Sequence, residues 1–336
     1  ELGGVRFRLF PAGPAHTAED LMMLVEDDGV LFAGDLIFAG EIGRPDLLGE
    51  AHTKQLAGQL FDTLRHRLAD LSDDLLVYPG HTAGSACGRK IGDAAVTTLG
   101  AERQFTYAFQ FEDEEEFIRA ILHEMPAPPP YYPKMKVVNR VGPALLESLP
   151  KGAALSAQEV ASAMANGALV IDAREEQSFD RAHIPGSYYA GSRSDAIAWV
   201  GWRAPYDQPV ILLLDRDEDY PFFVNELHRI GIDTIAGYLA GGIDVWLDSG
   251  GAVERLEVLS PERFRQLLGD QPAARLFDVR TLDEWRSGHI AKAANEFAGD
   301  LAAGGNGIQA EKDELVLLAC ASGYRSRVAA SLLQAR

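Results

Sequence analysis

The sequence predicts a multidomain protein that combines α/β and α+β architecture. Two observations lead to this prediction. One α/β pattern occurs twice in the second half of the chain, whereas the first 123 residues show a different pattern. A proline-rich segment separates these two parts. The length of 336 residues is sufficient for two or three domains.

The repeat is visible as matching strings of residues. "LVIDAREEQSFDRAHI", with Asp172, corresponds to "RLFDVRTLDEWRSGHI", with Asp278. "PVILLLD", which ends at Asp215, corresponds to "ELVLLAC", which ends at Cys320. Each copy predicts a helix, a buried strand, a loop with an acid and an arginine, and another buried strand that leads into a turn and a helix. Buried strands that alternate with helices indicate a parallel sheet covered on both faces.

We expect the second copy to lack its last strand and helix. The first copy continues for 31 residues after Asp215, as far as Trp246, and the matching point of the second copy would lie beyond Arg336. The repeats therefore predict one domain at residues 151–253 and a second, shortened domain at residues 254–336.

The segment "MPAPPPYYPKM", from Met125 to Met135, contains five prolines. Because proline is excluded from the interior of a helix, this segment predicts an extended strap. We assign residues 124–150 to this linker and residues 1–123 to a front domain.

The composition excludes several classes of partner. A net charge of −19 argues against nucleic acid, because binding a polyanion requires a basic surface. The longest apolar runs, such as "VILLL" at residues 210–214, are too short to span a bilayer, so we expect no membrane partner. Two cysteines in separate parts of the chain, Cys87 and Cys320, argue against a disulfide framework and indicate a cytoplasmic protein.

Cys320 follows a buried strand and precedes a helix in the string "CASGYRS". Unpaired N–H groups at the start of a helix, together with the helix dipole, stabilise a thiolate and lower its pKa. Gly323 permits a tight turn, and Arg325 closes a six-residue Cys-x4-Arg loop that suits a sulfur atom carried as a persulfide. A buried, inert cysteine is the alternative. The other residues of this persulfide-binding loop are Ala321, Ser322, Tyr324 and Ser326.

The matching loop of the first copy reads "DRDEDYP", with Asp215 in the cysteine position and Tyr220 in the arginine position. A carboxylate cannot carry sulfane sulfur, and the four acidic residues of this loop would repel an anionic donor. We therefore expect the first copy to be catalytically inactive and to serve as a spacer or docking domain.

His16, Asp35 and His81 each lie in a turn beside a predicted buried strand of the front domain. Two imidazoles and a carboxylate that converge from strand ends are typical ligands of Fe or Zn. Taken singly, His16 and Asp35 are also compatible with turn or cap residues, and His81 with a surface histidine. Cys87, in "AGSACG", either approaches this metal pocket or packs as a small residue.

The two repeats resemble rhodanese-type sulfurtransferase domains in the string D-x-R…E…GHI and in the Cys320 loop. The resemblance implies that Cys320 is the sulfur-carrying nucleophile and that Arg325 and the loop amides hold an anionic sulfur donor. In the front domain, "GPAHTAED", "FAGD" and "YPGH" resemble segments of the metallo-β-lactamase fold. "GEIGRPDLLG" resembles a narrower group, the persulfide dioxygenases, particularly bacterial fusions with one or two rhodanese domains.

This second resemblance implies a partial αββα sandwich and a mononuclear Fe(II) bound by two histidines and one aspartate. His16 and Asp35 would be ligands, and His81 would belong to a second site or to the outer shell. The family's His-x-His-x-Asp-His motif is not found before His16. We therefore expect an incomplete metal site, an exposed sheet face, and a chain that is a fragment of a longer protein.

Together, the resemblances predict an enzyme of sulfide detoxification. It would use O2 to oxidise a low-molecular-weight thiol persulfide to sulfite, and would move sulfane sulfur between persulfide, sulfite and thiosulfate through Cys320. The alternatives are a dizinc thioester hydrolase of the glyoxalase II kind fused to a sulfurtransferase, with His81 as a true Zn ligand, and a non-catalytic docking protein. The sequence leaves open the thiol carrier, the direction of transfer and the formation of a homo-oligomer.

Overall fold

The computed structural model describes residues 3–13, 20–47, 50–82, 87–88, 91–123, 125, 128–148, 151–192, 196–203 and 205–336. These residues form two compact units, which we call the front unit (residues 1–128) and the repeat unit (residues 129–336). The finer domain limits expected from the sequence remain predictions. None of the helices in the described ranges is both long and apolar enough to cross a membrane.

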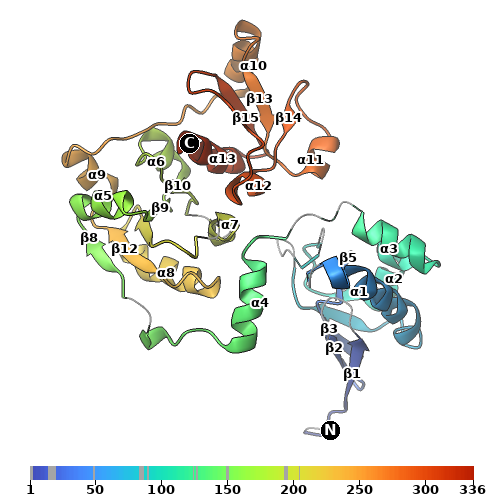
Figure 1. Ribbon diagram of the computed structural model, residues 1–336. Coiled ribbons are helices and arrows are strands. Elements are labelled where there is room, and N and C mark those ends of the chain that lie inside the picture. The colour runs from blue at the N-terminus through green and yellow to red at the C-terminus, as the bar shows by residue number, and fades with distance from the viewer. Residues whose placement is uncertain are drawn as a thin grey trace. The chain divides into compact units, whose positions relative to one another are not determined.

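The front unit is built on a five-stranded sheet in the order β1-β2-β3-β6-β7 (Figure 1). β1, β2 and β3 are antiparallel neighbours, β6 is parallel to β3, and β7 is antiparallel to β6. The strands are β1 (Phe7–Gly13), β2 (Asp20–Val25), β3 (Val30–Gly34), β6 (Leu76–Pro79) and β7 (Thr97–Thr98), and β4 (Ile37–Phe38) pairs separately with β5 (Glu41–Ile42).

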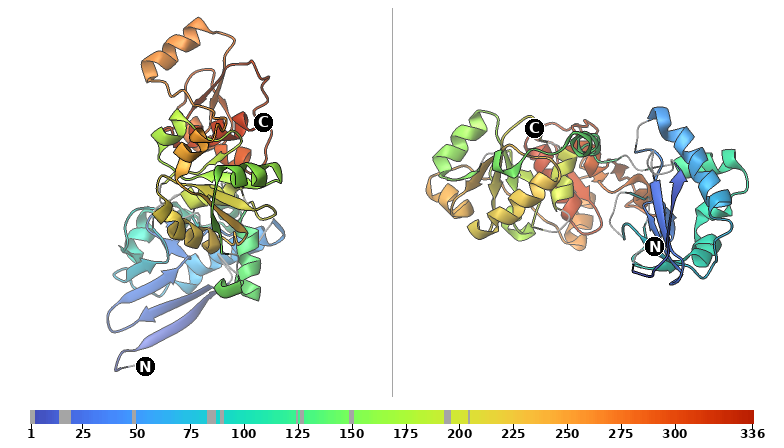
Figure 2. Two further views of the ribbon diagram at one scale, coloured as in Figure 1. Left: turned by 90° about the vertical axis from the view of Figure 1, so that its left-hand side faces the viewer. Right: turned by 90° about the horizontal axis from the view of Figure 1, so that it is seen from below.

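Helices cover one face of this sheet, as Figures 1 and 2 show. Leu60 of α1 and Phe117 of α3 are fully buried in a core that also contains Leu31 of β3. The carboxylate of Asp113 caps α3 by accepting a hydrogen bond from the N–H of Glu116 over 2.8 Å. The helices are α1 (Glu50–Asp62), α2 (Leu99–Phe105) and α3 (Glu114–Leu122), and a π-helical turn at Thr63–Arg67 continues α1.

The opposite face of the front sheet is apolar and exposed. Successive side chains of a strand point to opposite faces, so Leu31 is 0 % exposed while its neighbour Phe32 is 41 % exposed. Leu9 of β1 and Leu21 of β2 are 60 % and 58 % exposed. The rings of Phe32 and Tyr78 lie 5.5 Å apart on this face. This arrangement agrees with the exposed sheet face expected from the sequence.

The first repeat forms a five-stranded sheet in the order β10-β9-β11-β12-β8, in which all neighbouring strands are parallel. All four residues of β11 are buried, as expected for a central parallel strand covered on both faces. The strands are β8 (Ala153–Leu155), β9 (Leu169–Asp172), β10 (Tyr188–Tyr189), β11 (Val210–Leu213) and β12 (Ile235–Leu239).

Helices of the repeat unit pack on both faces of this sheet. Ile211 of β11 shares a core with Val160 of α5 and Trp246 of α9, whereas Leu212 shares a different core with Leu227 of α8. The predicted parallel sheet with two covered faces is therefore confirmed. The helices of the first repeat are α5 (Ala157–Ala165), α6 (Glu176–Arg181), α7 (Ala196–Arg203), α8 (Tyr220–Arg229) and α9 (Gly242–Asp248).

The second repeat forms a three-stranded parallel sheet in the order β14-β13-β15. Among the described residues of the first repeat, β12 is the one strand that pairs with β8, and residues 257–336, all described, contain no counterpart of β12. Residues 257–259, which match β8, consequently lack a partner and form no strand. The elements are β13 (Arg275–Asp278), β14 (Ala294–Asn295), β15 (Val316–Ala319), α10 (Pro261–Asp270), α11 (Leu282–Arg286), α12 (Ala298–Ala302) and α13 (Tyr324–Gln334).

The proline-rich segment is not extended throughout, which corrects the sequence prediction. Helix α4 (Tyr132–Val141) begins within it, and Pro133 lies in the first turn. Proline is tolerated there because the first N–H groups of a helix have no intrahelical acceptor. The prediction failed because it considered the number of prolines and not the position of the last one.

The two faces of β3 provide a test of the front unit. Leu31→Ala should lower its free energy of unfolding by about 2–5 kcal/mol, because it opens a cavity in a close-packed core. Phe32→Ala, one residue along the strand, should change it by less than about 1 kcal/mol. Amide hydrogen exchange of peptides from β1 to β6 measures both effects. Equal loss of protection in the two variants would contradict this assignment of the faces.

Candidate functional site

The Cys320 loop joins a strand to a helix of the second repeat. β15 ends at Ala319, Cys320 follows directly, and α13 begins at Tyr324. Gly323, just before the helix, has a φ of 91°, a left-handed conformation that strains any residue with a Cβ atom. A Cβ atom there would also lie 2.8 Å from Nη1 of Arg327. The backbone conformation and the nearby Arg327 side chain both explain why position 323 is a glycine.

The sulfur atom of Cys320 forms hydrogen-bonding contacts with Gly323 and Ser326. The N–H of Gly323 donates a hydrogen bond to Sγ over 3.1 Å, and Oγ of Ser326 lies 3.2 Å from Sγ. The Ser326 hydroxyl can also donate to the carbonyl oxygen of Gly323 over 3.1 Å. A hydroxyl rotates freely, so Ser326 can accept from a thiol while it donates to this carbonyl, or donate to a thiolate instead.

The environment of Cys320 favours the thiolate. Burial disfavours the charged form and is the largest single influence on the pKa, which it raises. Hydrogen bonds from the Ser326 hydroxyl and from the backbone N–H groups of Ser326, Ser322 and Gly323 act in the opposite direction. Together they outweigh burial, and the pKa of Cys320 lies below its usual value. A lowered pKa increases the fraction of nucleophilic thiolate at neutral pH.

Arg325 forms a two-pronged ion pair with Glu284. Its two terminal nitrogens lie 2.6 and 2.7 Å from the carboxylate oxygens. The bond to Arg325 is the main reason that the pKa of Glu284 falls to about 2, although partial burial opposes it. Glu284 also accepts hydrogen bonds from Thr281 in a capping box. A donor anion bound by Arg325 would share the guanidinium with Glu284, and the expected role of Arg325 remains a prediction.

The remaining loop residues contribute to the site through their backbone and not through their side chains. Ser322 contributes a backbone N–H that stabilises the thiolate, and Ala321 has no polar side-chain group. The side chain of Tyr324 is buried, and its hydroxyl donates a hydrogen bond to the carbonyl oxygen of Ala190 in the first repeat. Tyr324 therefore belongs to the loop through its backbone, whereas its side chain contacts the other repeat.

The first repeat has different residues at the positions of Cys320, Arg325 and Glu284. Asp215 occupies the cysteine position, and its carboxylate accepts a hydrogen bond over 2.7 Å from the backbone N–H that precedes α6. Tyr220 and Ser178 occupy the positions of Arg325 and Glu284. Both members of that ion pair are thus absent where the thiol is absent.

The acidic loop of the first repeat is partly neutralised by its own arginine. Arg216 lies 2.7 Å from a carboxylate oxygen of Asp219 and 3.1 Å from Glu218. Asp217 accepts hydrogen bonds from the N–H of Gly241. The repulsion of anions expected from the sequence is therefore reduced, although the loop still contains no nucleophile.

The D-x-R pair and the histidine of the GHI string have the same structural role in both repeats. Asp172 and Arg174 are buried and joined by hydrogen bonds of 2.5 and 2.9 Å, and the second repeat contains the same pairing. His183 and His289 each stack on the aromatic ring four residues earlier, with ring centroids 3.9 Å apart. Because the repeat without a thiol has these features too, we attribute them to folding.

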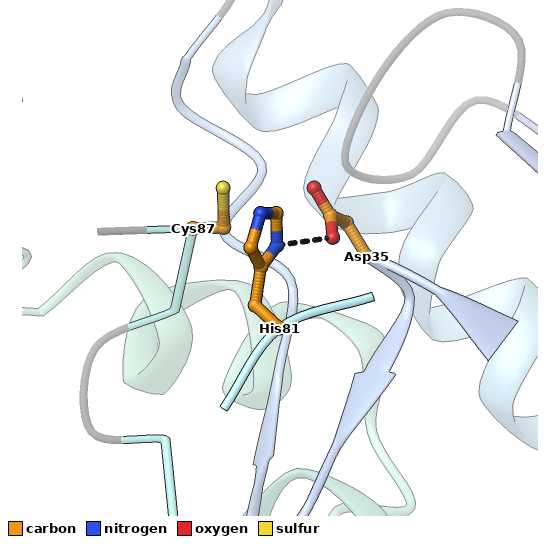
Figure 3. Close-up of side chains that lie close together, drawn as sticks. All are labelled: Asp35, His81 and Cys87. Carbon is orange, nitrogen blue, oxygen red and sulfur yellow. Dashed lines mark hydrogen bonds and ion pairs between the residues drawn. The ribbon is translucent and has the colours of Figure 1, made fainter. Parts of the chain in front are cut away.

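In the front unit, Asp35 and His81 meet at the ends of two neighbouring strands. Asp35 follows β3 and His81 follows β6, and these strands are parallel. Nδ1 of His81 lies 2.7 Å from Oδ1 of Asp35 (Figure 3). The N–H of Gly80 donates to the carbonyl of Gly34 over 2.7 Å, and a Cβ atom at Gly80 would lie 2.7 Å from the Asp35 carboxylate. The lack of a side chain at Gly80 thus allows the ends of β3 and β6 to approach each other closely.

Cys87 belongs to the same group of side chains. One donor atom each from Asp35, His81 and Cys87 lies within 4.8 Å of the others (Figure 3). This set of oxygen, nitrogen and sulfur donors fits an Fe or Zn ion in its chemistry, and a thiolate would favour zinc. His16 lies outside the described residues, so its predicted role as a ligand remains a prediction.

Sequence reasoning missed one partner in these sites and left the place of another open. Glu284 is the ion-pair partner of Arg325. The T-x-x-E pattern that starts at Thr281 predicts a helix cap, but it does not predict that Glu284 contacts the Cys320 loop. Cys87 was placed either near the metal or in packing, and the structure favours the first. The sequence before Cys87 carries no periodic pattern from which this position could be predicted.

Ser326→Ala tests the stabilisation of the thiolate. Loss of this hydroxyl should raise the pKa of Cys320 and slow its alkylation by iodoacetamide at pH 7 by roughly a factor of ten. The rate should be followed by mass spectrometry of the Cys320 peptide across a pH series. A profile unchanged from that of the wild type would show that the backbone donors suffice.

Comparison with known proteins supports both parts of this description. The rhodanese-like domain family matches residues 156–249 and 260–336, which together are just over half of the chain. The metallo-beta-lactamase superfamily matches residues 1–81. Hydroxyacylglutathione hydrolase GloC of Haemophilus influenzae is 30% identical over 91 residues, 27% of this chain and 40% of the relative. The chain thus spans about 40% of the length of the curated relatives that it matches.

Two solved structures extend the comparison. The metallo-beta-lactamase from Staphylococcus aureus is 30% identical, with a TM-score of 0.59, and the match covers 71% of this chain and 68% of that one. ETHE1 from Myxococcus xanthus is 27% identical with a TM-score of 0.34, and the match covers 42% of this chain and 55% of that one. The two family matches and the Staphylococcus aureus structure confirm the fold and the fusion predicted from the sequence: the chain belongs to the rhodanese-like family, with two such domains behind a metallo-beta-lactamase domain.

Proposed function

We propose that the repeat unit transfers sulfane sulfur through a persulfide on Cys320. The observation that carries this proposal is the pair of hydrogen-bond donors on Sγ, the Gly323 N–H and the Ser326 hydroxyl. They stabilise a thiolate before the reaction, and would stabilise a bound persulfide anion afterwards. The contrasting loop of the first repeat, with Asp215 in place of the thiol, supports a single sulfur carrier in the repeat unit.

The proposed step is a displacement at sulfur. The Cys320 thiolate attacks the outer sulfur of thiosulfate or of a thiol persulfide, and a new S–S bond forms as the old one breaks. The electron pair of the broken bond leaves with sulfite or with the thiolate of the carrier. Cys320 then holds the sulfur as Cys–S–S⁻, and the reverse displacement by an acceptor nucleophile restores the thiolate. No external oxidant is needed, since the sulfane sulfur only changes its partner.

For the intact protein, we propose that the front unit oxidises a low-molecular-weight persulfide. Asp35, with His16 and a further histidine, would hold Fe(II), and His81 would remain in the outer shell. When bound, the metal would supply open coordination positions at which O2 and the persulfide sulfur meet. One persulfide, one O2 and one water would yield one thiol, one sulfite and two protons. The support is the strand-end placement of Asp35 and the resemblance of "GEIGRPDLLG" to persulfide dioxygenases.

The two activities would share an intermediate. Sulfite released by the front unit is an acceptor for sulfur from Cys320, and fusion in one chain raises its local concentration. A persulfide carrier needs a reduced thiol at Cys320, so we propose a reducing compartment such as the cytoplasm.

A zinc-dependent thioester hydrolase is a second candidate for the front unit. It is favoured by the similarity to a hydroxyacylglutathione hydrolase and by Cys87, whose sulfur lies among the possible ligands. In that case two zinc ions would be bound, and His81 would be a ligand.

Cys320→Ser should abolish the transfer of sulfur from thiosulfate to cyanide, because serine cannot form a persulfide. Asp215→Ala is the matched control in the other repeat and should leave the rate unchanged. The assay measures thiocyanate formed by the intact protein. Full activity of the Cys320→Ser variant would remove the basis of the proposal.

Asp35→Ala should lower the metal content of the intact protein at least about tenfold and lower oxygen consumption with it. Asp62→Ala, which removes an exposed carboxylate on α1, should change neither value. Elemental analysis of the two variants, and of His81→Ala, decides between the candidates. Retention of one iron by His81→Ala supports the dioxygenase, and loss of two zinc ions supports the hydrolase.

A further inference from the structure

Helix α13 presents one of its faces to the first repeat. Tyr324, Arg327, Val328 and Ser331 are spaced so that they lie on one side of the helix, and each is at most 7 % exposed. Tyr324 and Val328 belong to the hydrophobic core of the first repeat. Ala329, on another side of α13, belongs to the core of the second repeat. The helix is therefore shared by both repeats.

Polar contacts fix the N-terminal end of this face. Nε and Nη2 of Arg327 each lie 2.9 Å from an oxygen of Asp180, and Nη1 lies 2.9 Å from Glu176. Both carboxylates belong to α6 of the first repeat. The Tyr324 hydroxyl donates to the carbonyl of Ala190, also in the first repeat. A two-pronged ion pair fixes the orientation of the arginine as well as its position.

These contacts flank the groups that hold the thiol. Gly323, which donates to Sγ of Cys320, directly precedes Tyr324, and Ser326 lies between Tyr324 and Arg327. The N–H of Arg327 donates to the carbonyl of Gly323 over 3.2 Å. Cys320 itself follows β15 of the second repeat. The thiol is thus held by one repeat, and its hydrogen-bond donors are fixed by contacts with the other.

The first repeat acts on the thiol through geometry. The arginines whose charge acts on the Cys320 thiolate are Arg280 and Arg325, and both belong to the second repeat. Asp180 and Glu176 face Arg327, near Tyr189. A displacement of α13 would therefore change the distance between the donors and Sγ, and would move Arg325 with the helix, whereas Arg280 would stay in place.

We propose that the first repeat, which has no thiol of its own, is a scaffold that positions the Cys320 loop, with Tyr324, Arg327 and Asp180 as positioning residues. This proposal builds on the sulfur-transfer function proposed above for Cys320. It assigns to the inactive repeat a role beyond that of a spacer. It also explains why an arginine is buried beside the loop without contact to the sulfur.

Alkylation of Cys320 tests the proposal in the full chain. Asp180→Asn and Arg327→Met should slow the reaction with iodoacetamide at pH 7 by about three- to tenfold and move the midpoint of its pH profile upward, because a displaced loop stabilises the thiolate less well. Arg327→Lys, which keeps the charge, should lie closer to the wild type than Arg327→Met. The extent of reaction is read from the mass of the Cys320 peptide.

Ser331→Ala is the matched control. Ser331 accepts a hydrogen bond from the N–H of Tyr189 over 3.1 Å, so this variant loosens the same interface two turns away from the loop. It should lower stability and leave the pH profile unchanged. An equal shift in Ser331→Ala, or an unchanged profile in both Asp180→Asn and Arg327→Met, would overturn the proposal.

Two further measurements keep the outcome interpretable. If circular dichroism shows that Asp180→Asn or Arg327→Met is unfolded, Tyr324→Phe, which removes a single oxygen atom, replaces that variant in the alkylation experiment. Alkylation does not depend on sulfur transfer. If Cys320→Ser retains sulfur transfer, the proposed function fails, whereas the pH profiles still decide whether the first repeat positions the loop.

Discussion

The double packing of α13 is the constraint on which the rest of the repeat unit depends. One side of the helix completes the core of the first repeat through Tyr324 and Val328, and another side completes the core of the second repeat through Ala329. A helix held on both sides has little freedom to slide or rotate, since each displacement would open a cavity in one of two close-packed cores. Because the Cys320 loop leads directly into this helix, the fixed position of α13 also fixes the loop and the hydrogen-bond donors to Cys320.

The internal repeat separates residues that fold the domain from residues that serve its chemistry. The hydrogen-bonded aspartate–arginine pair and the stacked histidine are present in both copies, so we attribute them to folding. The thiol, the left-handed glycine and the Arg325–Glu284 ion pair occur in the second copy only. The copy without a thiol still contributes packing and ion pairs to helix α13 of the other copy.

The same physical arrangement serves both candidate sites. Asp35 and His81 follow the carboxyl ends of two adjacent parallel strands, and Cys320 follows the carboxyl end of β15. The ends of parallel strands place side chains side by side at one edge of a sheet, where backbone groups are free to contact ligands. Glycine then permits the closest approaches, at Gly80 in the front unit and at Gly323 in the repeat unit.

The sequence alone determined the class of fold, the repeat, and the placement of Cys320, Asp35 and His81 at strand ends. These features follow from local rules, because the alternation of buried strands and helices and the turn residues are visible within short windows. The exception was α4, where Pro133 lies at a helix start that composition does not reveal.

Only the tertiary structure decided which charges meet. Arg327 and Asp180 are 147 positions apart, and Arg325 and Glu284 are 41 apart, with many other acids at comparable separation. The chain has 50 acidic and 31 basic side chains, and their pairing depends on distances that exist only once both cores have formed. The burial of the Tyr324 side chain, away from the thiol that its backbone helps to surround, was decided in the same way.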